Sequence, residues 1–229
     1  GWKKMCGKTI AHLLMLFWRL EGMSFQGYQT NKGVFFMSAN TKKLTVLAML
    51  TALSAVLITL VHFPLFPAAA FLQYDPADVV FLIGAFAFGP LAGLAVTVIA
   101  SAIQAFLLGG DGMYGFLMHV IASGALILVA GSIYRLLHTR TGGLIALVAG
   151  TVAMGLVMMV ANHFITPFYM GVPAQVVDAM LVTVILPFNL LKAGINSVIT
   201  FLVYKTVSRT LIHGEGWERK AAPKAGSEA

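Results

Sequence analysis

Charged side chains are scarce in this chain. Of its 229 residues only 10% are Asp, Glu, Lys or Arg, whereas 59% are hydrophobic. A soluble domain carries roughly 25% charged and about 45–50% apolar residues, so this chain has too few polar side chains to cover a surface that faces water. Between positions 44 and 204 the charged residues are Arg135, Arg140, Lys192, Asp75, Asp78, Asp111 and Asp178. Nearly uncharged apolar stretches of about 18 or more residues indicate membrane spans, and an integral membrane protein is therefore predicted.

Cysteine is almost absent, and the common catalytic motifs are missing. The single cysteine, Cys6, excludes an internal disulfide and a cysteine-based metal cluster. No G-x-x-x-x-G-K-[ST] sequence is present, so the chain does not bind ATP by that device. The six histidines are scattered, and neither an H-E-x-x-H motif nor a nucleophile–base pair is evident. A transport or binding subunit is therefore favoured over an enzyme, and we expect neither a metal site nor a resident cofactor.

Basic residues exceed acidic ones, 15 against 8, which gives a formal net charge of +7. In a soluble protein such an excess would suggest a nucleic-acid partner. Here twelve of the fifteen Lys and Arg residues lie in the terminal segments 1–43 and 205–229. Basic segments that flank membrane spans face the anionic lipid of the cytoplasmic leaflet, so membrane lipid, and not nucleic acid, is the expected partner of this charge.

The apolar runs, divided by turn residues, predict an all-α polytopic membrane protein built as a bundle of six transmembrane helices. The helices are expected at about residues 44–62, 77–88, 91–108, 114–137, 143–166 and 177–207. The second is too short to cross about 30 Å at 1.5 Å per residue, and Gly89 and Pro90 end it. Asp78 is expected to cap its first turn, and Pro187 is expected to kink the sixth helix.

Three regions follow from this pattern. They are an N-terminal extension at residues 1–37, the six-helix domain at 38–208, and a polar tail at 209–229 that is expected to be disordered. The extension has two interpretations. Met37 resembles a natural start, so the preceding residues read as an addition made by start-site assignment; alternatively, the apolar run at residues 10–18 belongs to an interfacial amphipathic helix.

The Lys and Arg residues near the helix ends set the expected orientation. With the N-terminus inside, the basic loop and flank residues all fall on the cytoplasmic side: Lys42, Lys43, Arg135, Arg140, Lys205 and Arg209. The aspartates at positions 75, 78, 111 and 178 then fall outside or at the outer helix ends. Both termini are therefore predicted to be cytoplasmic.

A stripe of polar residues follows one face of the sixth helix. Asn189, Lys192 and Asn196 are spaced 0, 3 and 7, which places all three on that face. A polar group inside a bilayer is costly unless it is paired, and it is a functional candidate by default. No Asp or Glu is expected at the depth of Lys192, so a ligand oxygen or the loss of its charge must compensate it. The alternative is that the stripe is structural and hydrogen-bonds neighbouring helices.

Other segments supply further candidates for the same cavity. Asn162 lies near the outer end of the fifth helix and is placed to enter from the opposite wall. Gln104 and His119 are weaker candidates, because such residues more often contact a neighbouring helix. Phe71 and Tyr74 lie in an unusually apolar first external loop, where they either stack on a planar ligand or pack at the interfacial aromatic belt.

The first helix carries a face of small residues. Ala48 and Ala52 are one turn apart, with Thr51 and Ala55 beside them. Small residues in this register let a second helix approach closely. That helix belongs either to another chain or to this same bundle, and spacing alone does not favour the other chain.

Several motifs resemble those of a known family. Residues 73–78 (QYDPAD) and 82–93 (LIGAFAFGPLAG) resemble the second-helix signature of the substrate-binding S components of energy-coupling factor (ECF) transporters. Residues 185–192 (ILPFNLLK) closely match the last-helix motif of the riboflavin-specific group, and Asn162 followed by an aromatic residue two positions later fits its fifth helix. The resemblance extends over about residues 40–208.

The resemblance implies a multi-pass subunit of a prokaryotic cell membrane that imports riboflavin, and FMN or analogues besides, as a transported ligand. Its implied partners are a transmembrane coupling subunit, the T component, and two cytoplasmic ATPases, with Ala48 and Ala52 docking on the coupling subunit. Asn162, Asn189 and Lys192 are the implied flavin contacts. With the candidates found above, the predicted substrate-binding set is Asn162, Asn189, Lys192, Tyr74, Phe71, Asn196 and Gln104. The loop after the first helix would gate the site through Phe66, Pro67, Asp75 and Asp78.

The third helix departs from the riboflavin-specific pattern. Members of that group often carry Glu, Lys, Asn and His after the G-P-L-A-G turn, whereas this chain has Thr97, Ala100, Ser101 and Gln104. If these positions line the site, the ligand is another micronutrient, such as pantothenate or a queuosine-type base. A competing hypothesis of another class is a polytopic membrane scaffold whose polar stripe is structural. Riboflavin import is the leading prediction.

Overall fold

The computed structural model describes residues 39–65, 71–108 and 112–211. The predicted N-terminal extension and most of the predicted C-terminal tail lie outside these residues. So do Phe66 and Pro67 of the first loop.

Helices make up most of the described chain. They are α2 (Ala39–Leu60), α3 (Ala77–Phe88), α4 (Pro90–Leu107), α5 (Gly112–Leu137), α6 (Arg140–Met170), α7 (Ala174–Met180), the π-helical turn η2 (Leu181–Ile185) and α8 (Leu186–Leu211). Within the described residues, five helical stretches are long and apolar enough to cross a membrane, the last of them continuous from Ala174 to Tyr204, and α3 is the shorter sixth. The predicted all-α membrane bundle is confirmed.

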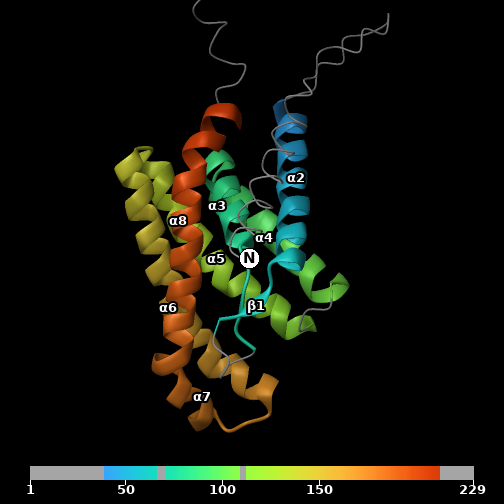
Figure 1. The fold of residues 1–229 in the computed structure, drawn as a ribbon, viewed down its shortest axis with the longest axis vertical. Coiled ribbons are helices and arrows are strands. Elements are labelled where there is room, and N and C mark those ends of the chain that lie inside the picture. The colour runs from blue at the N-terminus through green and yellow to red at the C-terminus, as the bar shows by residue number, and fades with distance from the viewer. Residues whose placement is uncertain (1–38, 66–70, 109–111, 212–229) are drawn as a thin grey trace, which may run out of the picture. The chain divides into compact units, whose positions relative to one another are not determined.

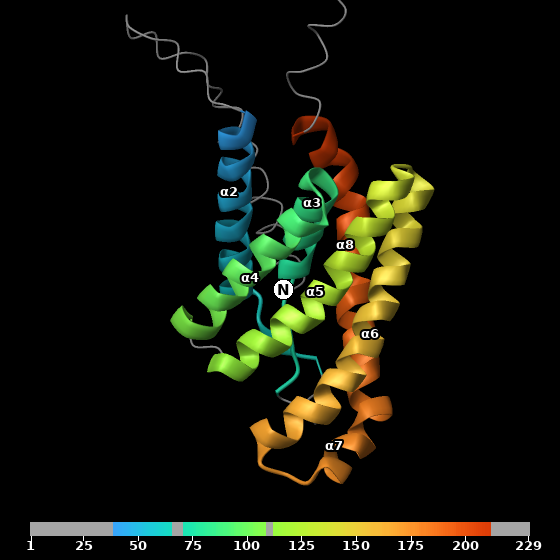
Figure 2. The ribbon, with the colours of Figure 1, turned by 180° about the vertical axis from the view of Figure 1, so that it is seen from behind.

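Figures 1 and 2 show how the helices are arranged. Helices α6 and α8 run side by side, α5 packs against α6 and α4, and α2 stands on the opposite side of the bundle. The start of α2, the α5–α6 turn and the end of α8 lie at one end of the bundle, and α7 lies at the other. The segments that carry the predicted cytoplasmic Lys and Arg residues therefore gather at one end, as the positive-inside pattern requires.

The short helix α3 lies in the middle of the bundle. It contacts α2, α4, α5 and α8, and every residue from Ala77 to Phe86 is buried. Its 12 residues extend only about 18 Å, which is roughly 12 Å less than the hydrocarbon core of a bilayer. The last turn of α3 lies toward the same end of the bundle as the α5–α6 turn (Figure 2). Because the helix is so short, its first residue therefore lies inside the bundle and not at the opposite surface.

Helices α3 and α4 are joined by a turn that requires glycine. Gly89 has φ 98° and ψ 161°, a backbone region open essentially only to glycine. Pro90 is the first residue of α4. The backbone N–H at this position has no partner within a helix, so proline, which lacks that N–H, fits there without losing a hydrogen bond. The two helices then pack so closely that a Cβ on Gly93 would lie 2.6 Å from the Cβ of Ala85. The helix end predicted at Gly89 and Pro90 is confirmed.

The last two predicted helices differ in detail from the structure. Helix α6 begins earlier than predicted, because the Thr139 hydroxyl caps it by accepting a 2.9 Å bond from the Gly142 N–H, and it continues to Gly171, where the chain turns left-handed at φ 65°. The predicted sixth helix contains the π-helical turn η2, in which the Leu186 N–H bonds to the Leu181 carbonyl. Pro187 follows directly and cannot donate to the helix, so the irregularity predicted there takes the form of a wider turn.

The loop between α2 and α3 returns on itself as a small hairpin. Strand β1 (Phe63–Pro64) pairs antiparallel with β2 (Gln73–Tyr74), with Phe63 opposite Tyr74 and Pro64 opposite Gln73. The hairpin brings the two arms of the loop together. Asp75 follows β2 directly and is thereby placed between the loop and the start of α3.

Candidate functional site

A cavity of about 190 Å³ lies between the first loop and helices α4, α5, α6 and α8. Most of its wall is apolar, with methionine and aromatic side chains from α5, α6, α8 and the loop. The polar side chains that line it are His62, Gln73, Asp75, Gln104, His119, Asn162, Thr166, Asn189 and Lys192. An apolar pocket with a few convergent polar groups is the usual form of a small-molecule site.

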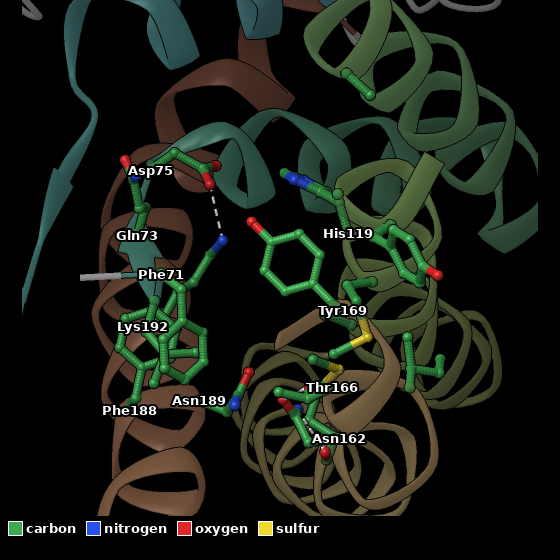
Figure 3. A pocket seen from close by; sticks show the side chains of 18 of the residues that line it. Phe71, Gln73, Asp75, His119, Asn162, Thr166, Tyr169, Phe188, Asn189 and Lys192 are labelled. Atoms are coloured by element: carbon green, nitrogen blue, oxygen red, sulfur yellow. Dashed lines mark hydrogen bonds and ion pairs between the residues drawn. The ribbon is translucent and has the colours of Figure 1, made fainter. Parts of the chain in front are cut away.

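Lys192 and Asp75 form the charged end of the cavity (Figure 3). The Lys192 ammonium donates to Asp75 Oδ2 at 2.8 Å, and the two side chains are 8% and 3% exposed. The prediction that no carboxylate lies at the depth of Lys192 is therefore wrong. Asp75 lies this deep because α3 is too short to span the bilayer, so the loop that precedes it descends into the bundle.

The surroundings of the Asp75 carboxylate favour its ionised form. Burial alone would raise its pKa, but the Lys192 ammonium and the hydrogen bonds to the carboxylate outweigh burial and hold that pKa below its ordinary value. One of these bonds comes from the Ala77 backbone N–H, which donates to Asp75 Oδ1 at 3.1 Å. This bond occupies the first backbone N–H of α3. Asp78 lies in the first turn, but no described side chain forms an N-cap hydrogen bond at this helix end, so the prediction that Asp78 caps it is wrong.

A hydrogen-bonded network behind this pair ties the loop to α8 and α5. Asn196 Nδ2 donates to the Asp75 carbonyl and to Asp78 Oδ2, each at 3.0 Å. Asn196 Oδ1 accepts from the Tyr74 hydroxyl at 2.9 Å, and Asp78 Oδ1 accepts from Ser123. Because these buried groups satisfy one another, the inner arm of the loop is fixed against α8.

The network changes the roles expected of three residues. Asp78, predicted at an outer helix end, is fully buried. Tyr74 and Asn196, predicted as substrate contacts, bond to each other and are not among the residues that line the cavity. They fix the loop from behind the wall, so two members of the predicted substrate-binding set are placed apart from the others.

Two asparagines form the amide end of the cavity, away from the charged end (Figure 3). Asn162 Nδ2 donates to the Met158 carbonyl at 2.7 Å, and its Oδ1 accepts from Thr166 at 2.8 Å. Asn189 Nδ2 donates to the Ile185 carbonyl at 2.8 Å. An amide nitrogen has two N–H donors and an amide oxygen has two lone pairs, so each side chain retains one donor and acceptor capacity for a ligand.

The structure brings Phe71 and Gln104 to the same cavity, Phe71 from the loop and Gln104 from α4. Four positions of the third helix depart from the riboflavin-specific pattern: Thr97, Ala100, Ser101 and Gln104. Among the described residues that line the cavity, Gln104 is the only one of these four. Thr97 bonds to the Gly93 carbonyl, and Ala100 and Ser101 are buried away from the lining. Most of the departure from the riboflavin-specific pattern therefore lies outside the site.

Some residues of the wall had little or no signal in the sequence analysis. His119 is only a weak candidate by sequence, and Thr166, Tyr169 and Phe188 are not in the predicted substrate-binding set, although all four line the cavity. One signal was available on α6, where four of the six lining residues lie at every fourth position: Met154, Met158, Asn162 and Thr166. This spacing keeps all of them on one helix face.

The small-residue face of α2 points away from the bundle. A stripe at every fourth position is exposed: Leu44, Ala48, Ala52, Val56 and Leu60. The buried residues of the helix, among them Leu50 and Ser54, lie on the other side. The interpretation that Ala48 and Ala52 pack within the same bundle is therefore wrong for the part of the chain that the structure describes.

Several proteins named riboflavin transporters are similar to this chain in sequence. The riboflavin transporter FmnP of Bacillus subtilis is 32% identical over 172 residues, which cover 71% of this chain and 90% of that protein. The riboflavin transporter RibU of Staphylococcus aureus is 28% identical over 177 residues (74% and 92%), and RibU of Streptococcus thermophilus is 31% identical over 187 residues (78% and 88%).

A solved structure and a family match agree with these relatives. The chain superimposes on a structure described as the S component of a bacterial ECF transporter with a TM-score of 0.67 and 27% identity, over 76% of this chain and 99% of that chain. The family described as the substrate-specific component of ECF transporters matches residues 42–204, which include the whole cavity wall. This chain belongs to the family of ECF transporter substrate-specific components.

Proposed function

We propose that this chain binds riboflavin in the cavity and acts as the substrate-specific component of a transporter that imports the vitamin. The observation that carries the proposal is the cavity itself, in which two asparagine amides and a lysine stand around an apolar, partly aromatic wall. The chain is also 27–32% identical to proteins named riboflavin transporters. A flavin is the ligand that both observations favour.

The chemistry of the flavin ring fits the amide end. The isoalloxazine ring is planar and apolar over most of its surface, with carbonyl oxygens, ring nitrogens and one N–H along one edge. Asn162 and Asn189 each offer a donor and an acceptor to such an edge, and Phe71 and Phe188 supply apolar surface for the ring. Lys192 has three N–H donors, of which the described contacts commit one, to Asp75, so its ammonium can also donate to the ligand.

The size of the cavity supports a gate. Pockets for ligands of this size have volumes of about 300–1,000 Å³, whereas this cavity has about 190 Å³, so its wall must move to admit a flavin. We assign this movement to the wall that Phe71 forms from the first loop; Phe66 and Pro67, the other predicted gate residues there, lie outside the described residues. Asp75 and Asp78, predicted as gate residues, anchor the inner end of the loop through the network behind the cavity.

The remaining parts of the transporter come from other chains in this proposal. The chain has no P-loop sequence, so ATP hydrolysis belongs to two cytoplasmic ATPases, which a T component couples to this subunit. The exposed stripe that contains Ala48 and Ala52 is the surface we assign to the T component, because small side chains let a partner helix approach closely. The end of the bundle that carries the basic segments faces the cytoplasm of a prokaryotic cell.

Equilibrium binding to the protein purified in detergent tests the proposal. We expect riboflavin to bind with quenching of its fluorescence, and FMN and flavin analogues are titrated in parallel. Protein that binds pantothenate or a queuosine-type base but no flavin would contradict the riboflavin assignment. Folded protein that binds none of these ligands would favour the scaffold hypothesis.

A further inference from the structure

His119 is a polar residue of the cavity wall that forms no hydrogen bond in the Lys192–Asp75 pair or in the network behind it. It belongs to the face of α5 that lines the cavity, where wall residues recur about once per turn: Tyr114, Gly115, Met118, His119 and Ala122. Its ring lies against Phe81 of α3 in an edge-on contact, with 6.1 Å between the ring centroids and 71° between the planes. The imidazole therefore has a defined place in the wall.

One nitrogen of this imidazole has no partner. His119 Nε2 is shielded from solvent and forms no hydrogen bond with the residues that the structure describes. Buried polar atoms in native proteins are nearly always bonded, and an exception needs an explanation. In the wall of a binding cavity, the simplest explanation is that the ligand supplies the bond.

The position of the ring indicates which part of a ligand it would meet. In Figure 3 the nitrogens of His119 point across the cavity toward Asp75 and Lys192, away from Asn162 and Asn189. The cavity thus has two unlike polar ends. The amide end is uncharged, whereas the charged end combines a carboxylate, an ammonium and an imidazole.

The two ends suit the two polar parts of riboflavin. The edge of the ring presents acceptors and one donor in a fixed plane, which matches amides. Each hydroxyl of the ribityl chain both donates and accepts, so a row of hydroxyls can bond to a carboxylate, an ammonium and an imidazole together. We infer that the charged end binds the ribityl chain and that His119 Nε2 hydrogen-bonds to one of its hydroxyls. The inference rests on the proposed function. Since Nε2 is covered, its bond forms as the wall moves to admit the ligand.

Riboflavin and lumiflavin, which has the same ring with a methyl group in place of the ribityl chain, test this inference. Wild-type protein should bind riboflavin more tightly than lumiflavin. His119→Phe retains an aromatic ring but has no polar atom, and it should weaken riboflavin binding roughly 2- to 12-fold, as expected for one hydrogen bond. Its affinity for lumiflavin should stay within about twofold of wild type. His119→Gln places an amide near the lost Nε2 and should recover most of the riboflavin affinity.

His163→Phe is the matched control, because His163 bonds to Asp178 and is not among the residues that line the cavity. It should bind both flavins as wild type does. The inference is wrong if His119→Phe lowers the affinity for riboflavin and for lumiflavin by the same factor, or lowers neither. It is also wrong if His119→Gln binds riboflavin no more tightly than His119→Phe does, or if wild-type protein binds the two flavins equally well. Wild-type protein that binds neither flavin contradicts the proposed function, and this inference with it. Lumiflavin binding also reports folding. If His119→Phe loses all measurable binding of both flavins, the variant is misfolded and His119→Ala replaces it under the same criteria; an equal but measurable loss for both flavins still contradicts the inference.

Discussion

Lys192 Nζ and Asp75 Oδ2 lie 2.8 Å apart, although the two residues are separated by 117 positions in the chain. One belongs to the last helix and the other to the first loop, so the pair joins the two ends of the membrane domain. Moving each ion out of water costs several kcal/mol, and their attraction offsets this cost only with good geometry and further hydrogen bonds. The Ala77 N–H supplies such a bond to the Asp75 carboxylate.

Removing one member of this pair should therefore cost more than removing both. Asp75→Leu leaves a buried ammonium without a counter-charge, and Lys192→Met leaves a buried carboxylate; each is expected to lower the free energy of unfolding by about 3–5 kcal/mol. The double variant Asp75→Leu/Lys192→Met should lose less than the sum of the two. Thermal unfolding of the purified proteins in one detergent measures all three, and a double variant as unstable as the sum would contradict the ion pair.

An exposed pair provides the control for this cycle. His163 and Asp178 contact each other with side chains that are 41% and 40% exposed, and an exposed pair of this kind contributes about 0–1 kcal/mol even where both partners are charged. Asp178→Asn should therefore leave the melting temperature nearly unchanged. A loss as large as that of Asp75→Leu would mean that removal of any carboxylate destabilises the bundle, and burial would not explain the effect.

The amide end should determine affinity for the flavin ring. Asn162→Ala and Asn189→Ala each leave polar atoms of the ligand edge unpaired, and we expect each to weaken riboflavin binding by about 1–3 kcal/mol, or roughly 5- to 150-fold. Because the ring is shared, lumiflavin should weaken by the same factor. Fluorescence titration of both ligands measures this effect, and a loss confined to riboflavin would place these amides at the ribityl chain.

Thr183→Val is the control for the amide variants. Thr183 lies in η2 and is exposed, and its hydroxyl donates to the Ala179 carbonyl one turn earlier. Thr183 lies in the same membrane-spanning stretch as Asn189 but is not among the residues that line the cavity. Its affinity for both flavins should match that of wild type.

The sequence indicated Lys192 as a buried functional residue but not its partner. Lys192 was conspicuous because it is a lone cation in an apolar helix. The sequence prediction places Asp75 outside because residues between two membrane helices ordinarily lie at the membrane surface. The short length of residues 77–88 was visible in advance, and a helix of about 18 Å cannot place both of its ends at the two surfaces of a ~30 Å layer. The depth of Asp75 could have been inferred from that mismatch.

Other features depend on contacts that no local pattern contains. Helical periodicity placed Asn189, Lys192 and Asn196 on one face, but Asn189 and Lys192 line the cavity whereas Asn196 bonds to Tyr74 behind it. What separates them is where the loop hairpin meets α8, and this is decided by tertiary packing. Spacing within one helix can select a face; it cannot tell which part of that face another segment covers.

The exposed stripe of α2 should matter for transport and not for binding. Ala48→Leu and Ala52→Leu add bulk on a face that no described residue covers, so purified variants should bind riboflavin with wild-type affinity. In cells that supply the T component and the ATPases, uptake of labelled riboflavin should fall severalfold, because larger side chains hold the partner helix away. Ala95→Leu, an exposed alanine on α4, should leave uptake unchanged. Reduced binding, or equal loss of uptake in Ala95→Leu, would contradict a docking role.

The contact between α3 and α4 should tolerate no side chain at Gly93. A Cβ there would lie 2.6 Å from Ala85 Cβ and 2.9 Å from Ala85 Cα, and the backbone of α3 cannot move away because other helices surround it. Gly93→Ala is therefore expected to destabilise the bundle by about 1–3 kcal/mol through overpacking. Gly194→Ala is the matched change on α8, where a Cβ would meet nothing within 4 Å, and it should be neutral or stabilise by up to about 1 kcal/mol through helix propensity. Melting temperatures in detergent decide between these outcomes. If the two variants melt together, close packing of α3 against α4 does not limit stability, and the position of Asp75 at the start of α3 must be held by its hydrogen bonds alone.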